Sequence, residues 1–177
     1  VVNSQPTSDL FISEYGEGSS NNKYIEIYNA TGSSVDLSSY AMWKITNGGS
    51  WPEYTLSLSG LLASNGVYII YHGSSNPTIV AAGDITWSQA SFNGDDAIGL
   101  AKNGVLIDAI GEDGPDPGSG WDVAGTTDAT KDHTLVRKCS VIAGNTDWNL
   151  SAGTDALNSE WVVLSQNDWS DIGQHTS

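Results

Sequence analysis

The chain has 177 residues, which suit one domain with a sizeable hydrophobic core, and a second full core would be cramped. Its 21 acidic and 6 basic residues give a formal net charge of −15, which repels polyanions, so we expect no direct binding to nucleic acid. No stretch reaches the roughly 18 apolar residues of a membrane-spanning helix, and the single cysteine, Cys139, excludes an intrachain disulfide.

Short β-rich runs separated by Gly, Asn, Asp and Ser clusters dominate the chain, and no sustained helical period occurs. Residues 1–8 are polar and contain Pro6, so we expect a flexible lead-in followed by one domain over residues 9–175. The expected strands are Leu10–Tyr15, Tyr24–Tyr28, Tyr40–Thr46, Tyr54–Leu58, Val67–Tyr71, Ala97–Lys102, Val105–Ile110, Thr134–Lys138 and Trp161–Leu164. Nine short strands predict an all-β sandwich.

Two connections stand out. Asn103-Gly104 joins two expected strands and tolerates positive φ, which makes it the strongest hairpin signal in the chain. The stretch between Gly111 and Asp132 is rich in Gly, Asp, Thr and Pro, which neither a strand nor a helix tolerates. We predict a long loop there, and loops of that length are often functional.

Several segments, in order, resemble one known family. They are Ile12-Ser13-Glu14-Tyr15, Glu17–Lys23, Ile25–Asn29, Val35-Asp36-Leu37, Leu58-Ser59-Gly60, Asn93–Ala97 with Leu100, Asp132–Lys138 and Gly173-Gln174-His175. Together they resemble lamin tail domains, in the secreted bacterial branch, over about residues 9–175.

The resemblance implies an immunoglobulin-like β-sandwich with Greek-key connections and long loops. It implies a non-catalytic accessory module, monomeric and secreted, that needs no cofactor and has a neighbouring catalytic domain in its parent chain. In that branch the module accompanies extracellular nucleases, phosphatases and polysaccharide-degrading enzymes. The deficit of Lys and Arg is also typical of secreted proteins from salty water.

The tryptophans supply the candidate ligand-binding residues, because an exposed indole can stack on a sugar and a buried one is core. Trp51 lies in a loop beside Pro52, and Trp87 precedes the Asn93-Gly94 turn, so we expect both to be exposed. With Tyr54 they form a candidate surface for a neutral or cation-bridged polysaccharide.

The other tryptophans are expected to be structural, with Trp169 left unassigned. Trp43 shares a strand face with Ala41 and Ile45, so we expect it to point inward. Trp121, Trp148 and Trp161 are expected to pack under loops.

Acidic residues suggest two kinds of site. Asp95 and Asp96 follow a turn, where Asx side chains usually cap backbone, but with Asp113 and Asp116 of the long loop they are also candidate Ca²⁺ ligands. Glu14 and Glu26 lie on neighbouring expected strands; we interpret them as structural or solvated rather than as a catalytic pair.

His72, His133 and His175 have no partner at zinc-ligand spacing, and no nucleophile motif is present. The sequence therefore predicts a non-enzymatic module that binds a polysaccharide or cell-surface glycan and so targets a neighbouring enzyme domain. The alternative is a purely structural spacer or a protein-interaction module attached to an extracellular nuclease or other hydrolase.

Overall fold

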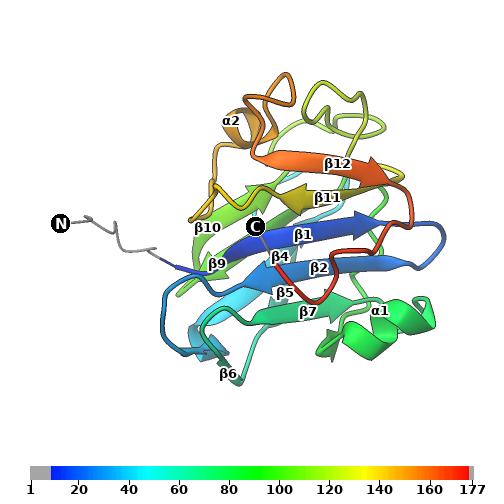
Figure 1. The fold of residues 1–177 in the computed structure, drawn as a ribbon. Coiled ribbons are helices and arrows are strands. Elements are labelled where there is room, and N and C mark those ends of the chain that lie inside the picture. Colours follow the sequence, from blue (N-terminus) through cyan, green and yellow to red (C-terminus); the bar gives the residue numbers. More distant parts are fainter. Residues whose placement is uncertain (1–8, 176–177) are drawn as a thin grey trace.

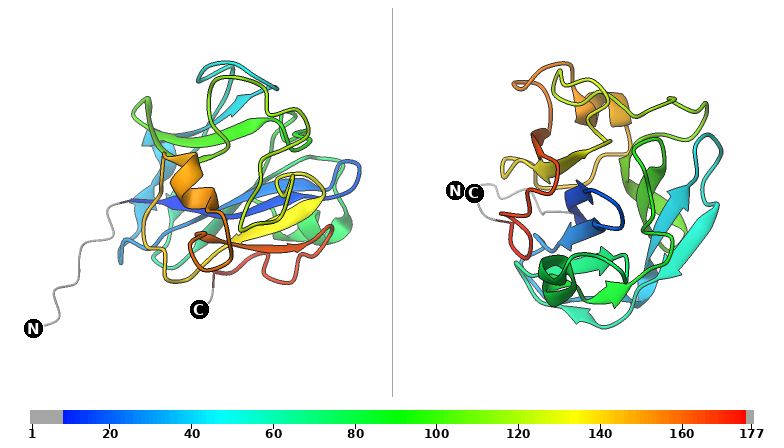
Figure 2. Two further views of the ribbon diagram at one scale, coloured as in Figure 1. Left: turned by 90° about the horizontal axis from the view of Figure 1, so that it is seen from above. Right: turned by 90° about the vertical axis from the view of Figure 1, so that its right-hand side faces the viewer.

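The computed structural model describes residues 9–175, so the expected lead-in of residues 1–8 lies outside the described residues. Two sheets lie face to face, as Figures 1 and 2 show. The strands and helices, in chain order, are β1 (Phe11–Glu17), β2 (Lys23–Tyr28), β3 (Val35–Asp36), β4 (Tyr40–Ile45), β5 (Tyr54–Ser57), β6 (Leu61–Leu62), β7 (Val67–Tyr71), α1 (Pro77–Ala82), β8 (Ile85–Thr86), β9 (Ala97–Lys102), β10 (Val105–Ile110), β11 (His133–Arg137), α2 (Trp148–Ala152) and β12 (Trp161–Ser165).

The strands form a large sheet in the order β12-β11-β1-β2-β7-β8 and a small sheet in the order β10-β9-β4-β5. β3 and β6 make a separate two-stranded pair. The chain crosses between the two main sheets from β2 to β4, from β5 to β7, from β8 to β9 and from β10 to β11. These crossovers confirm the predicted all-β, immunoglobulin-like sandwich with Greek-key connections.

All nine expected strands are present, with ends within two residues of the prediction. The strands β3, β6 and β8 were not predicted, because each has only two residues, too few to show an alternation of apolar and polar side chains. The helices α1 and α2 have six and five residues and are too short for a helical period, although Asn76 caps α1 and Pro77 begins it. None of the helices in the described part is long and apolar enough to span a membrane.

The main core lies between the two sheets. Apolar side chains from both sheets are fully buried there, including Ile12, Ile25, Met42 and Leu100. The Asn103-Gly104 turn has φ values of 51° and 76°, as the hairpin prediction requires. The long loop is also confirmed, since Gly111 to Asp132 contain only isolated β-bridges.

A buried ionic contact joins the sheets at one end. Asp108 of β10 in the small sheet accepts hydrogen bonds from the guanidinium of Arg137 in β11, at 2.7 Å, and from the N–H of Ile12 in β1, at 2.7 Å. Both charged side chains are fully buried. The Asp108 carboxylate therefore holds β10 against two strands of the large sheet.

The part of the outer face of the large sheet over β1 and β2 is covered by residues 166–175, here called the C-terminal segment, which Figure 1 shows in red. Trp169 and Ile172 of this segment pack on a second apolar cluster around Tyr24 and Ile69. The side chains beneath the C-terminal segment therefore form a second buried apolar layer.

Candidate functional site

Trp51 lies on the outer face of the small sheet. Ile98 and Leu100 of β9 point into the core, so Gly99 between them faces outward. A Cβ built on Gly99 would lie 3.3 Å from Cζ3 of Trp51 and 2.6 Å from Cδ1 of Leu106. Because Gly99 has no side chain, the indole of Trp51 can approach the strand this closely.

Trp43 lies on the same outer face, and the expectation that it points inward is wrong. It is the register partner of Gly99, and its ring centroid is 6.4 Å from that of Trp51 with the planes 34° apart. The misleading residue is Ile45, which shares this outer face with Trp43 but is buried there, since Gly49 of the following loop lies against it. On the opposite face the charge of Lys44 gives no sign of solvent either. Lys44 is in fact buried, with Nζ 3.0 Å from Oδ2 of Asp96.

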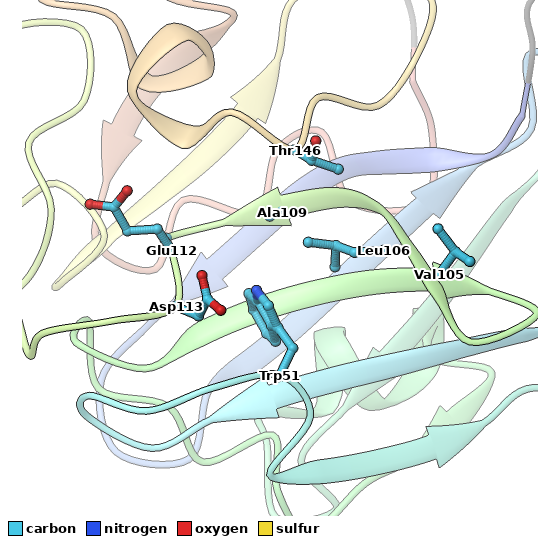
Figure 3. Close-up of a pocket in the computed structure, with 8 residues that line it drawn as sticks. Trp51, Val105, Leu106, Ala109, Glu112, Asp113 and Thr146 are labelled. Atoms are coloured by element: carbon cyan, nitrogen blue, oxygen red, sulfur yellow. The ribbon is translucent and has the colours of Figure 1, made fainter.

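Trp51 lines a hollow of about 360 Å³, which we call the Trp51 hollow. Its other lining residues come from β10, from the loop after it and from the approach to α2: Val105, Leu106, Ala109, Gly111, Glu112, Asp113 and Thr146. Figure 3 shows the indole of Trp51 and the carboxylates of Glu112 and Asp113 beside this hollow. It thus combines an apolar floor with an acidic rim.

The rim carboxylates have free accepting capacity. Glu112 accepts one hydrogen bond, from Nδ2 of Asn149 at 3.3 Å, while Asp113 accepts none from the described residues. A carboxylate accepts and does not donate, so these groups are suited to hydroxyl donors.

The loop that carries Trp51 is tied to its surroundings. Gly49 and Gly114 exchange backbone hydrogen bonds of 3.0 and 2.8 Å, which join this loop to the long loop. The N–H of Asn47 donates to Asp96 at 2.9 Å, and the N–H of Thr46 donates to Glu53 at 2.7 Å. A loop held this way loses little conformational entropy when a ligand binds.

The expected partners of Trp51 are elsewhere. Trp87 is only 7 % exposed and belongs to the main core, so the expectation that it is exposed is wrong. The backbone N–H of Trp87 donates to the carbonyl of Tyr71 at 2.9 Å. This bond holds Trp87, which directly follows β8, against the sandwich. Tyr54 packs against the main core from β5, on the opposite face of the small sheet from Trp51.

The remaining tryptophan predictions hold. Trp148 and Trp161 are buried, and the half-buried Trp121 packs against the same core. Sequence reasoning missed Trp43, Leu106, Glu112 and Thr146 as neighbours of Trp51. The one usable signal was Gly99, since a glycine inside a strand often marks close approach by another group.

The four candidate Ca²⁺ ligands lie in different environments. The carboxylate of Asp96 forms an ion pair with Lys44 and accepts a hydrogen bond from the N–H of Asn47. The carboxylate of Asp116 accepts a hydrogen bond from the N–H of Gly118 at 2.6 Å. Asp95 is buried with Oδ1 lacking a partner within the described structure, and burial, followed by the charge of Asp96, raises its pKa.

Asp113, the fourth, is exposed. Among residues 9–175, no three His, Cys, Asp or Glu side chains are grouped so that they could hold a metal ion. Calcium binding therefore stays a prediction, because the described residues do not bring the candidate ligands together around one point.

Glu14 and Glu26 are register partners on β1 and β2, and the expectation that they are solvated is wrong. Both are buried, and Glu26 accepts hydrogen bonds from the Ser13 hydroxyl at 2.7 Å and from the Gly173 N–H at 2.8 Å. The hydroxyl of Tyr24 donates to Glu14. The C-terminal segment covers the pair, which fits the structural interpretation.

Comparison with known proteins gives one assignment. No curated protein matches the chain. The lamin tail domain family model matches residues 3–114, which is more than half of the 177 residues. Lamin tail domains are immunoglobulin-like modules that are generally non-catalytic. The chain belongs to the lamin tail domain family.

Proposed function

We propose that this module binds a neutral glycan in the Trp51 hollow and so brings a neighbouring enzyme domain of a secreted bacterial protein to a polysaccharide or cell surface. The observation that carries the proposal is the juxtaposition of two half-buried indoles, Trp43 and Trp51, with the acceptor groups of Asp113 and Glu112.

This combination matches the two halves of a sugar ring. The C–H groups of a pyranose form an apolar face that packs on an indole, and its hydroxyls donate hydrogen bonds to carboxylates. A volume of about 360 Å³ lies within the range of small-ligand sites. The hollow is therefore large enough for one or two sugar units of a longer polymer.

Charge narrows the choice of glycan. The net charge of −15 and the acidic rim repel uronic-acid and sulfated polymers, so the proposal names a neutral polysaccharide. The same acidic composition supports an extracellular protein exposed to salt, which screens the self-repulsion.

The test is affinity electrophoresis of the module through gels that contain neutral polysaccharides, such as β-glucans, mannans and xylans. We expect retention on at least one polymer, and Trp51→Ala should weaken binding at least tenfold, about 1.4 kcal/mol. Asp113→Ala, at an exposed position, should weaken it several-fold without changing the melting temperature.

Leu157→Ala is the matched control, because Leu157 is a 95 % exposed apolar residue outside the hollow. It should leave retention unchanged. Retention of Trp51→Ala equal to that of the parent chain would sink the proposal, and failure of every polymer would favour the structural spacer. Running the gels with and without chelator also tests the calcium prediction.

A further inference from the structure

The Trp51 hollow has a different polarity at each end. The strand β10 runs along it and begins with the apolar residues Val105 and Leu106. The carboxylates of Glu112 and Asp113 follow the other end of the same strand. Figure 3 shows the indole of Trp51 between the two ends. A sugar stacked on this indole would therefore face hydrogen-bond acceptors on one side and apolar side chains on the other.

The apolar end is open to solvent. Val105 is 64 % exposed, and the half-buried Leu106 lies beside Trp51 over Gly99 of β9. A hydroxyl placed over these apolar side chains would lose water without gaining a partner, whereas a methyl group there would bury apolar surface. This end of the hollow therefore suits a ligand with an apolar substituent.

Thr146 supplies a polar group close to this apolar surface. The N–H of Ala109 donates to the carbonyl of Asn145 at 3.2 Å, which holds the next residue, Thr146, beside β10. Thr146 is exposed, and its hydroxyl makes no hydrogen bond to any of residues 9–175. Because a hydroxyl both donates and accepts, it can bond an amide through either the carbonyl or the N–H.

We propose that the sugar unit held on Trp51 carries an acetamido group, so that the ligand is a neutral polymer of N-acetylated amino sugars. The inference rests on the proposed glycan function of the same hollow. An acetamido group combines a methyl, which covers Leu106 and Val105, with an amide, which bonds the Thr146 hydroxyl. A ring hydroxyl has no methyl group, and the methyl of a 6-deoxy sugar has no amide. The ring hydroxyls on the other side of the sugar remain free to donate to Asp113.

The test compares two neutral tetrasaccharides by isothermal titration calorimetry at 150 mM salt. The β-1,4-linked tetramers of N-acetylglucosamine and of glucose differ only in the substituent at C2 of each unit. We expect the parent chain to bind the N-acetylated tetramer at least tenfold more tightly than the glucose tetramer. The deacetylated tetramer, which has ammonium groups in place of the amides, separates the effect of the acetamido group from that of charge.

Two variants locate the acetamido contact. Val105→Ser removes apolar surface at an exposed position, and Thr146→Val replaces the hydroxyl with a methyl group at nearly constant shape. Each should reduce the preference for the N-acetylated tetramer to less than threefold without changing the melting temperature. Leu61→Ser is the matched control, because Leu61 is a 72 % exposed strand residue outside the hollow. It should keep the full preference.

Equal binding of the two neutral tetramers would overturn the inference and leave glycan binding itself standing. Tighter binding of the deacetylated tetramer would also overturn it, because charge would then select the ligand. Binding of neither neutral tetramer, with retention on another polysaccharide, would refute the acetamido assignment alone. The absence of retention on every polymer would remove the proposed function together with it.

Discussion

Glu14 and Glu26 are titratable groups that burial perturbs strongly. Burial raises the pKa of Glu14 to about 8, with a smaller contribution from the charge of Glu26, while the Tyr24 hydroxyl opposes the shift. Burial likewise raises the pKa of Glu26 to about 7, against the hydrogen bonds from Ser13 and Gly173. Near neutral pH burial therefore favours the protonated form of Glu14 on the outer face of the large sheet.

The raised pKa of Glu14 makes the free energy of unfolding depend on pH. Between the ordinary pKa of 4.5 and the raised value, the folded state holds a proton that the unfolded state has lost. The free energy of unfolding is therefore highest below about pH 4.5, as far as this group is concerned, and falls as the pH rises toward 8. The stabilising form is the neutral one.

Glu14→Gln should remove this dependence, because the amide stays neutral. We expect its melting temperature at pH 9 to exceed that of the parent chain by at least about 2–4 °C, which corresponds to about 1 kcal/mol in a domain of this size. At pH 4.5 the two should melt together. Circular dichroism melts measure this, with Asp122→Asn as an exposed control; the same difference at both pH values would refute the explanation.

At the scale of elements, the contact between Asp108 and Arg137 joins β10 to β11, and Asp108 also receives the N–H of Ile12 in β1. Its removal would leave a buried guanidinium without its main partner. Breaking such a pair typically costs about 3–5 kcal/mol.

We therefore expect Asp108→Ala to lower the free energy of unfolding by about that amount in urea denaturation. The double variant Asp108→Ala/Arg137→Met, which removes both charges, should recover part of the loss. A single variant that costs less than about 1 kcal/mol would show that the sheets do not depend on this contact.

At the scale of the whole molecule, the sequence was sufficient for the fold, but not for the surroundings of Trp51, whose indole was expected to be exposed and is half-buried. The nine longer strands follow from alternating apolar runs and from turn residues, and these signals are local. The faces of β4 were misread because Ile45, on the outer face with Trp43, is buried by the loop at Gly49, while Lys44, on the inner face, is buried by its pairing with Asp96. Contacts with loops and distant residues leave no local pattern.

The same reason explains the other errors. Trp87 lies among polar residues that look like a loop, and only the parallel pairing of β8 with β7 carries it into the core. Glu14 and Glu26 alternate as solvent-facing residues would, and the C-terminal segment that buries them comes about 140 residues later. Where a distant segment covers a strand, alternation alone cannot distinguish solvent from a second core.

The proposal of a glycan site on the small sheet is tested most directly by the indole N–H signals in a ¹H–¹⁵N spectrum of the module, titrated with an oligosaccharide of the polymer that retains it. Trp43 and Trp51 should shift together and saturably, while the buried Trp148 and Trp161 stay unchanged and serve as internal references. Shifts confined to other residues, with Trp43 and Trp51 unmoved at saturation, would contradict the account.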